Sequence, residues 1–194
     1  MEEIVPKDSR YVPIPQQPSC CCPACISMIM YKNNIPLVPQ ELLGYHLGLI
    51  VREEDKHLYW NPRDGVKPPS GYGTQIYRPE YHPDVAFKTL NIPLKMTYHS
   101  VNDFADTENL VDFISEKIAD NADLMACFNH ERLNGSHHGG HLCVIDIVDN
   151  GMIRLVDPQR DEPKWHNVNA EDLLDAMKIH GQEKMGGIWE FKKV

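Results

Sequence analysis

Runs of apolar residues, separated by prolines, glycines and asparagines, divide this chain of 194 residues into predicted helices and strands. Residues 24–31 are apolar on almost every face, with only Ser27 polar, which is typical of a buried helix. Apolar periodicity and the residues at segment ends predict helices over 40–50, 83–91 and 107–120, and strands over 93–99 and 122–129. The pattern therefore predicts a mixed α/β (α+β) chain.

The second half of the chain predicts a hairpin of two buried strands. Residues 141–148 are apolar on both faces except at Asp146, as expected of a central strand, and residues 152–157 form its partner. A capped helix over 169–180 and a strand over 187–194 follow. The hairpin predicts that the sheet is antiparallel.

The length of the hairpin loop decides which face of the sheet Asp157 occupies. We predict a three-residue loop over 149–151, with Gly151 left-handed. In that register Asp157 lies opposite Cys143, on the same face as His141 and diagonal to it, where the two side chains can meet. A two-residue loop would turn Asp157 to the opposite face unless a bulge compensated for it.

From residue 52 to residue 81 the apolar periodicity disappears, and charged residues, prolines, glycines and aromatic residues alternate. An irregular segment of this length is unusual in a compact domain and is often a lid or a binding loop, so we predict a loop insertion that determines specificity. We expect it to be the most mobile or the most cleft-exposed part of the chain, with Trp60 and Tyr72 near the cleft. A surface insertion without a role is the alternative.

Length, charge and cysteine placement limit the class of protein. The length fits a single domain spanning residues 1–194. A net charge of −9 argues against nucleic acid and anionic membrane as partners, because both select basic surfaces. The acidic N-terminus is unlike a signal peptide, and no apolar run approaches the ~18 residues of a membrane span. Four of the six cysteines crowd into residues 20–25, so we expect a cytoplasmic protein rather than a secreted disulfide framework.

The densest candidate chemistry lies where an extended arm meets the first helix. Three prolines between residues 13 and 18 hold the arm extended, because proline restricts its own φ and the residue before it. Proline is tolerated in the first turn of a helix, so Pro23 places the helix start at about Cys21 or Cys22. The unpaired N–H groups at a helix start favour a thiolate, which is the nucleophilic form of cysteine.

The segment VPIPQQPSCCCPACISMIM resembles the active-site segment of the bacteriocin-processing (double-glycine leader) peptidases and their stand-alone relatives, which are papain-like cysteine peptidases. The pattern of that family is a glutamine, a short gap and then Cys-Gly-Pro-Ala, with a methionine four residues after the alanine. Cys21, Pro23, Ala24 and Met28 match this pattern. Cys22 stands where the family has glycine.

Two later motifs extend the resemblance. In the family a histidine after glycine opens a strand, and an aspartate or asparagine before proline closes the next one; His141 and Asp157 stand at these positions. The resemblance implies a papain-like fold whose nucleophile helix packs on an antiparallel sheet carrying the histidine and the aspartate. It implies that Cys21 attacks a carbonyl while His141 transfers the proton and Asp157 orients the imidazole. The Gln16 amide, with the backbone N–H of Cys21, would stabilise the oxyanion.

The implied function is a cysteine hydrolase that cleaves a peptide or isopeptide bond through a thioester acyl-enzyme. Its substrate is a peptide or protein, and the chemistry needs no metal and no organic cofactor. On the same fold, acyl transfer of the phytochelatin-synthase type is an alternative. A relative that binds peptides without cleaving them is another, because Cys22 replaces glycine; Cys22 is also the rival nucleophile.

Two alternatives from other classes use the same cysteines. Residues 22–25 form a CxxC motif at a helix start, as in thioredoxin-like oxidoreductases, although no apolar strand precedes it. A zinc site could instead combine the cysteines with His137, His138 and His141. Three adjacent cysteines cannot converge on one tetrahedral ion, which argues against that site.

Overall fold

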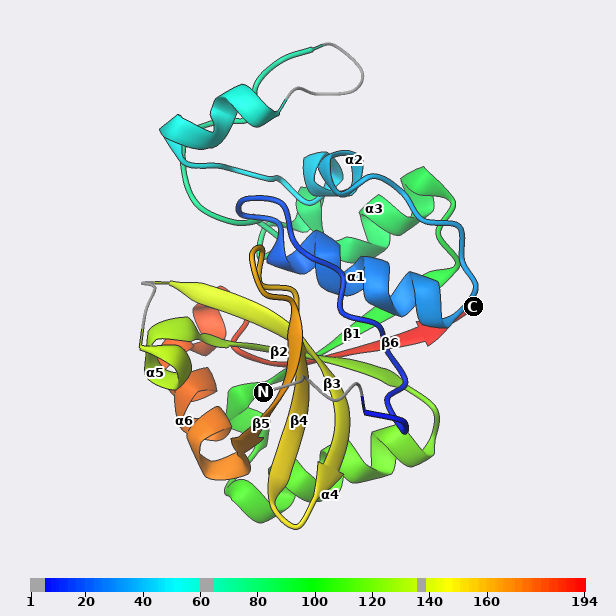
Figure 1. The fold of residues 1–194 in the computed structure, drawn as a ribbon, viewed down its shortest axis with the longest axis vertical. Coiled ribbons are helices and arrows are strands. Elements are labelled where there is room, and N and C mark those ends of the chain that lie inside the picture. Colours follow the sequence, from blue (N-terminus) through cyan, green and yellow to red (C-terminus); the bar gives the residue numbers. More distant parts are fainter. Residues whose placement is uncertain (1–5, 60–64, 136–138) are drawn as a thin grey trace.

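The computed structural model describes residues 6–59, 65–135 and 139–194, which Figure 1 shows as a ribbon. Its centre is a six-stranded antiparallel sheet in the order β1-β6-β2-β3-β4-β5. The strands are β1 Leu94–Ser100, β2 Asp123–Asn129, β3 Gly140–Asp149, β4 Met152–Asp157, β5 Lys164–Asn169 and β6 Gly187–Lys193. The helices are α1 Cys21–Lys32, α2 Gln40–His46, α3 Pro83–Leu90, α4 Thr107–Ala119, α5 His130–Asn134 and α6 Ala170–His180. Short 3-10 helices in the connections are η1 Glu53–Leu58, η2 Pro79–Tyr81, η3 Val101–Asp103 and η4 Gln182–Lys184.

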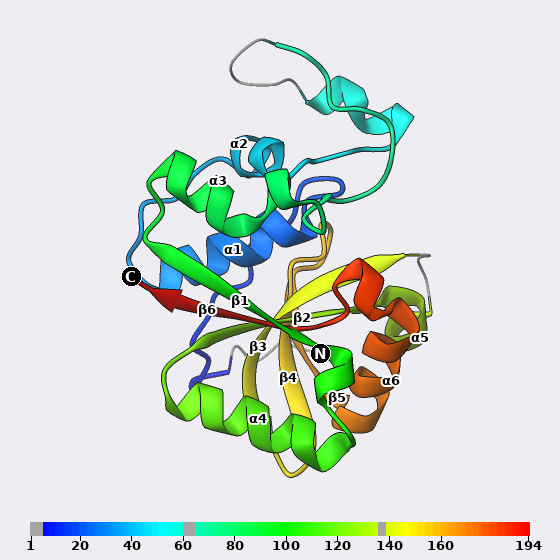
Figure 2. The same ribbon diagram turned by 180° about the vertical axis from the view of Figure 1, so that it is seen from behind.

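The side chains of the sheet alternate between two hydrophobic cores. In β2, Leu124 and Phe128 belong to the core under α4 and α6, whereas Met125 belongs to the core under α1. Figures 1 and 2 show α1–α3 on one side of the sheet and α4–α6 on the other. Because helices cover both faces, the central strands are continuous apolar runs in the sequence.

Most of the predicted elements are confirmed, including the start of α1 at Cys21. The second helix was predicted to run to residue 50, which is wrong: α2 ends at His46. Gly48 then takes a left-handed φ of 68°, which stops the helix. Sequence reasoning missed β5 and α5, because β5 is largely polar and α5 is only five residues long. The predicted C-terminal strand, β6, lies between β1 and β2 in the sheet.

The β3–β4 hairpin differs from the predicted register. Its loop has two residues, Asn150 and Gly151, both left-handed with φ of 49° and 75°. Asp149 pairs with Met152, so the predicted three-residue loop is wrong. The physical reason is that Asn-Gly suits the tighter type I′ turn, whose twist matches that of the strands. A bulge at Asp146 then shifts the register of the two strands by one residue.

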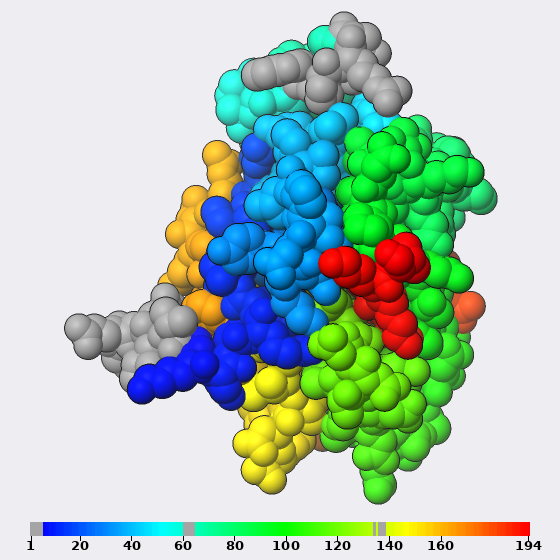
Figure 3. Space-filling view, turned by 90° about the vertical axis from the view of Figure 1, so that its right-hand side faces the viewer, coloured from blue at the N-terminus to red at the C-terminus, as the bar shows by residue number. Residues whose placement is uncertain are grey.

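The bulge at Asp146 compensates for the short loop, and the N-terminal arm holds it in place. The buried carboxylate of Asp146 accepts hydrogen bonds from the Arg10 backbone N–H at 2.9 Å and from Arg154 Nε at 2.8 Å. Extending the register that precedes the bulge by one pair places Asp157 opposite Cys143, as predicted. Figure 3 shows the blue N-terminal arm beside the yellow hairpin.

The predicted insertion over residues 52–81 has little regular structure where it is described. It contains η1 and η2, and two isolated bridges, from Ser70 to Val51 and from Gly73 to Ile50, tie it back to the preceding residues. The cyan part of this segment projects beyond α2 in Figure 1. Trp60 lies outside the described residues. Among the residues described, no helix combines the length and the hydrophobicity needed to cross a membrane.

Candidate active site

Cys21 is the first residue of α1, where the extended arm turns into the helix. Ser19 is left-handed, with a φ of 63°, and the Cys20 N–H closes the turn on the Gln17 carbonyl at 2.9 Å. This turn leaves Cys21 partly exposed at a cleft, whereas the other five cysteines are buried. Cys21 is therefore the most accessible of the six cysteines.

Burial makes the neighbouring cysteines poor nucleophiles. It raises the pKa of Cys22 and of Cys25 well above the ordinary thiol value, and that of Cys20 to about 12. The Cys25 thiol also donates to the Leu142 carbonyl at 3.3 Å. Both sulfurs of the CxxC motif are fully buried, so the structure does not favour the thiol-disulfide alternative. The rival nucleophile, Cys22, packs in the core under α1.

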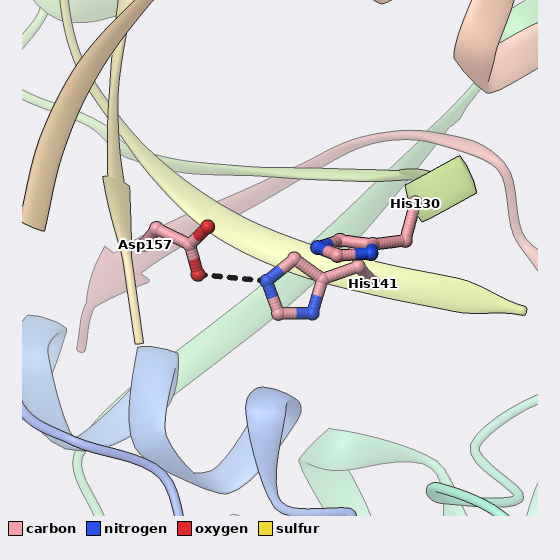
Figure 4. A group of neighbouring side chains, drawn as sticks. All are labelled: His130, His141 and Asp157. Atoms are coloured by element: carbon pink, nitrogen blue, oxygen red, sulfur yellow. Dashed lines mark hydrogen bonds and ion pairs between the residues drawn. The ribbon is translucent and has the colours of Figure 1, made fainter. Parts of the chain in front are cut away.

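His141 and Asp157 meet across two neighbouring strands. His141 is the second residue of β3, and Asp157 is the last residue of β4. Figure 4 shows the carboxylate facing the edge of the ring, with 2.8 Å between His141 Nε2 and Asp157 Oδ1. The same oxygen accepts the backbone N–H of Gln159 at 3.0 Å. Both side chains are buried, so water does not compete for this hydrogen bond.

The electrostatics of the site favour charged forms of this pair. Burial disfavours the imidazolium, but hydrogen bonds with Asp157 and Cys21 outweigh burial and raise the pKa of His141 to about 10. Burial also disfavours the carboxylate, but the hydrogen bond from His141 outweighs it and lowers the pKa of Asp157. The imidazole that binds Asp157 therefore carries a proton at neutral pH.

Gln16 reaches the site from the arm. Its backbone N–H donates to the Pro158 carbonyl at 2.7 Å, which ties the arm to the residue after Asp157. The next glutamine, Gln17, is turned toward α2, since its side-chain amide donates to Glu41 Oε1 at 2.6 Å. Of the two glutamines, Gln16 is therefore the one at the cleft.

A cavity of about 340 Å³ is lined by Gln16, Cys21 and His141. Residues 72–74, 76 and 77 form another wall, so part of the predicted insertion borders the cleft. Apolar side chains on the remaining walls include Leu142, Ile179 and Trp189. A larger cavity of about 580 Å³ lies between α2 and the insertion, but none of the predicted site residues lines it. The smaller cavity is therefore the candidate active site.

Sequence reasoning missed His130, the first residue of α5. Its ring lies edge-on to that of His141, with centroids 4.6 Å apart and an interplanar angle of 74° (Figure 4). The available signal was its position directly after the buried strand β2, which pairs with β3. His130, His141 and Asp157 offer donor atoms within 4.8 Å of one another, so this set could hold a metal ion.

Asp157 also belongs to a second set of possible metal ligands. Cys143 from β3 and His166 from β5 offer donor atoms within 4.8 Å of the Asp157 carboxylate and of each other. Among the described residues, neither set contains a cysteine from residues 20–25. Two histidines of the zinc site considered from the sequence, residues 137 and 138, lie outside the described part of the chain.

No protein-family profile and no curated protein matches this sequence. Solved structures do match. A protein from Bacillus anthracis described as a C39-like peptidase is 16% identical, with a TM-score of 0.59 over 93% of this chain and 94% of that one. A double glycine motif protease from an AMS/PCAT transporter, in complex with a leader peptide, is 15% identical, with a TM-score of 0.50 over 98% and 97% of the two chains. The predicted papain-like fold, and the resemblance to the double-glycine peptidases at the level of the fold, are confirmed.

Proposed function

We propose that this protein is a cysteine peptidase that cleaves a peptide or isopeptide bond through a thioester acyl-enzyme. The observation that carries the proposal is the His141 imidazole, which binds the buried carboxylate of Asp157 and lines the same cleft as Cys21 at a helix N-terminus. A nucleophile, a base and an orienting carboxylate in this order are the parts of acyl-transfer catalysis. The fold shared with a protease that binds a leader peptide supports a peptide as the substrate.

In the first step the Cys21 sulfur attacks the scissile carbonyl. Asp157 engages Nε2 of His141, so Nδ1, which Figure 4 shows on the other side of the ring, is left for the sulfur. The pair reacts as thiolate and imidazolium: a C–S bond forms, the C–N bond breaks, and the imidazolium protonates the leaving amine. The raised pKa of His141 keeps this proton on the ring until the amine leaves.

The tetrahedral intermediate needs hydrogen-bond donors for its oxyanion. The Gln16 side-chain amide and the Cys21 backbone N–H are the donors that we assign to this task, since both residues line the cleft. One donor of this kind contributes roughly 2.7–4 kcal/mol of transition-state stabilisation. The hydrogen bond from the Gln16 N–H to Pro158 holds the arm that carries this amide.

The second step releases the acyl group from Cys21. The neutral imidazole of His141 takes a proton from water, the hydroxide adds to the thioester, and the carboxylic acid and the thiol leave. An amine or a thiol in place of water would give acyl transfer. Mass spectrometry of the products, with and without an added amine or thiol acceptor, distinguishes the two reactions.

Alkylation with iodoacetamide at neutral pH, followed by peptide mapping, tests the assignment of the nucleophile. We expect Cys21 to react far faster than the other five cysteines, because burial suppresses their thiolates. Cys21→Ala should abolish rapid labelling, whereas Cys22→Gly should retain it. Cys25→Ser is the matched control on the same helix and should also retain it.

Three outcomes would overturn parts of the proposal. Loss of labelling in Cys22→Gly, with normal labelling in Cys21→Ala, would make Cys22 the nucleophile. Labelling of Cys22 and Cys25 that rises and falls together with redox state would restore the CxxC alternative. If Cys21 is labelled rapidly but a peptide library yields no acyl-enzyme and no cleavage products, the alternative of a protein that only binds peptides is supported.

A further inference from the structure

Three neighbouring strands bring a cysteine, an aspartate and a histidine together beside the cleft. Cys143 lies in β3, Asp157 ends β4 and His166 lies in β5, and β4 pairs with both other strands. The three donor atoms all lie within 4.8 Å of one another. Paired strands hold their side chains at set spacings, so the cluster is preorganised by the sheet.

Two of these donor atoms have no hydrogen-bond partner in the part of the chain that the structure describes. Asp157 uses Oδ1 for His141 and for the Gln159 N–H, while its Oδ2 is buried without a partner. The side chain of Asp157 is only 1% exposed. Nε2 of His166 lies 4.0 Å from Oδ2 and is likewise buried without a partner. Buried polar atoms are normally satisfied by a protein group, by water or by a ligand, so a bridging group fits between these two atoms.

We propose that Cys143, Asp157 and His166 bind one divalent transition-metal ion of the zinc class. Thiolate, carboxylate and imidazole are the ligand types that Zn²⁺ takes in proteins. Donor atoms around a tetrahedral zinc lie roughly 3.3–3.8 Å apart, given bonds of about 2.0–2.3 Å. Side-chain shifts of about 1 Å are therefore enough to close the site around an ion.

The charge and the access of the cluster suit such an ion. On binding, the Cys143 thiol releases its proton to solvent, and its thiolate and the Asp157 carboxylate, which also faces His141, place two negative charges beside the ion. The neutral imidazole of His166 supplies the third bond. The side chain of His166 is 20% exposed, so this end of the cluster lies near the surface, from which an ion would enter.

The proposed ion and the active site share Asp157 through different oxygens. His141 is held by Oδ1, and the ion would bind Oδ2, so the hydrogen bond between His141 and Asp157 is kept. The neighbouring set of His130, His141 and Asp157 differs, because a metal there would take the nitrogen or the oxygen that forms this bond. His130 therefore provides a control that separates the two sets.

Cobalt titration of the full chain tests the proposal independently of peptidase activity. The titration uses the Cys21→Ala variant, which lacks the most accessible thiol. The variant is first freed of metal with a chelator, and binding of added Co²⁺ is then followed by visible absorption spectroscopy. We expect one equivalent to bind, with a thiolate-to-cobalt charge-transfer band that Zn²⁺ abolishes by displacement. His166→Gln should weaken binding by more than about tenfold, since even outer-shell partners of a metal contribute roughly 10–100-fold. Cys143→Ser should remove the charge-transfer band, and His130→Gln should leave both the band and the affinity unchanged.

Four results would overturn the assignment. Absence of Co²⁺ binding would mean that only water bridges Asp157 and His166. Binding lost in His130→Gln but kept in His166→Gln would move the metal to the neighbouring set. A charge-transfer band that survives Cys143→Ser would assign the thiolate to another cysteine. Cys143 is fully buried, so circular dichroism is used to check that Cys143→Ser folds. If it does not, the more exposed His166→Gln variant decides the question, and an unchanged affinity of His166→Gln for Co²⁺ excludes the site.

Discussion

Replacement of Asp146 by alanine removes the residue that holds the bulge in β3. The variant leaves the Arg10 backbone N–H and the Arg154 guanidinium without the buried carboxylate that they share. Removing one partner of a buried ion pair costs about 3–5 kcal/mol. Arg154 is only 12% exposed but keeps a second contact, to Asp8 at 3.1 Å, so we expect the lower end of this range, about 3 kcal/mol.

The effect on the site is separate from the effect on stability. Without the bulge, the two-residue loop would pair the strands in the register that turns Asp157 to the other face of the sheet. His141 would then lose the carboxylate that stabilises its charged form. We therefore expect folded Asp146→Ala to react with iodoacetamide at Cys21 more slowly than the parent protein near neutral pH.

Two assays separate these effects of Asp146→Ala. Urea unfolding followed by circular dichroism should show a midpoint lower by roughly 1–1.5 M, for an m-value of ~2–3 kcal/mol/M. Iodoacetamide labelling without urea measures the effect on Cys21. Asp149→Ala, which removes an exposed carboxylate from the same strand, is the control and should change neither result. A folded Asp146→Ala protein with parental stability and parental labelling would refute the reasoning.

Two further predictions concern the proposed catalytic residues. Asp157→Asn removes the charge that helps to raise the pKa of His141. The imidazolium exists below this pKa and is lost as the pH rises through it, so the alkaline fall of kcat/KM should move to lower pH. An unchanged alkaline fall of kcat/KM would contradict the role assigned to Asp157. Gln16→Ala should lower kcat/KM by ~10²–10³-fold, since one oxyanion donor contributes roughly 2.7–4 kcal/mol. Alkylation of Cys21 forms no oxyanion and should be unaffected, so an equal loss in both assays would assign Gln16 a structural role only.

The sequence by itself determined the features that depend on a few adjacent residues. Pro23 located the start of α1 at Cys21 to within one residue, because proline is tolerated only in the first turn of a helix. This constraint depends only on adjacent residues. Apolar runs located β2, β3 and β4, since each of these strands contributes side chains to both hydrophobic cores. The Cys, Gly-His and Asp-Pro motifs occur in the same order as in the double-glycine leader peptidases, and this resemblance predicted the papain-like fold.

Only the tertiary structure decided what depends on contacts between distant segments. The bulge at Asp146 is held by Arg10, which lies 136 residues away in the sequence. The three-residue loop, predicted so that Asp157 would reach His141, was therefore wrong, while the final register of Asp157 was right. The gathering of Cys143 and His166 around Asp157 requires β5, a strand whose polar composition hides it from periodicity. Register and burial arise from packing across the whole sheet, and a change of one residue in register moves every following side chain to the other face.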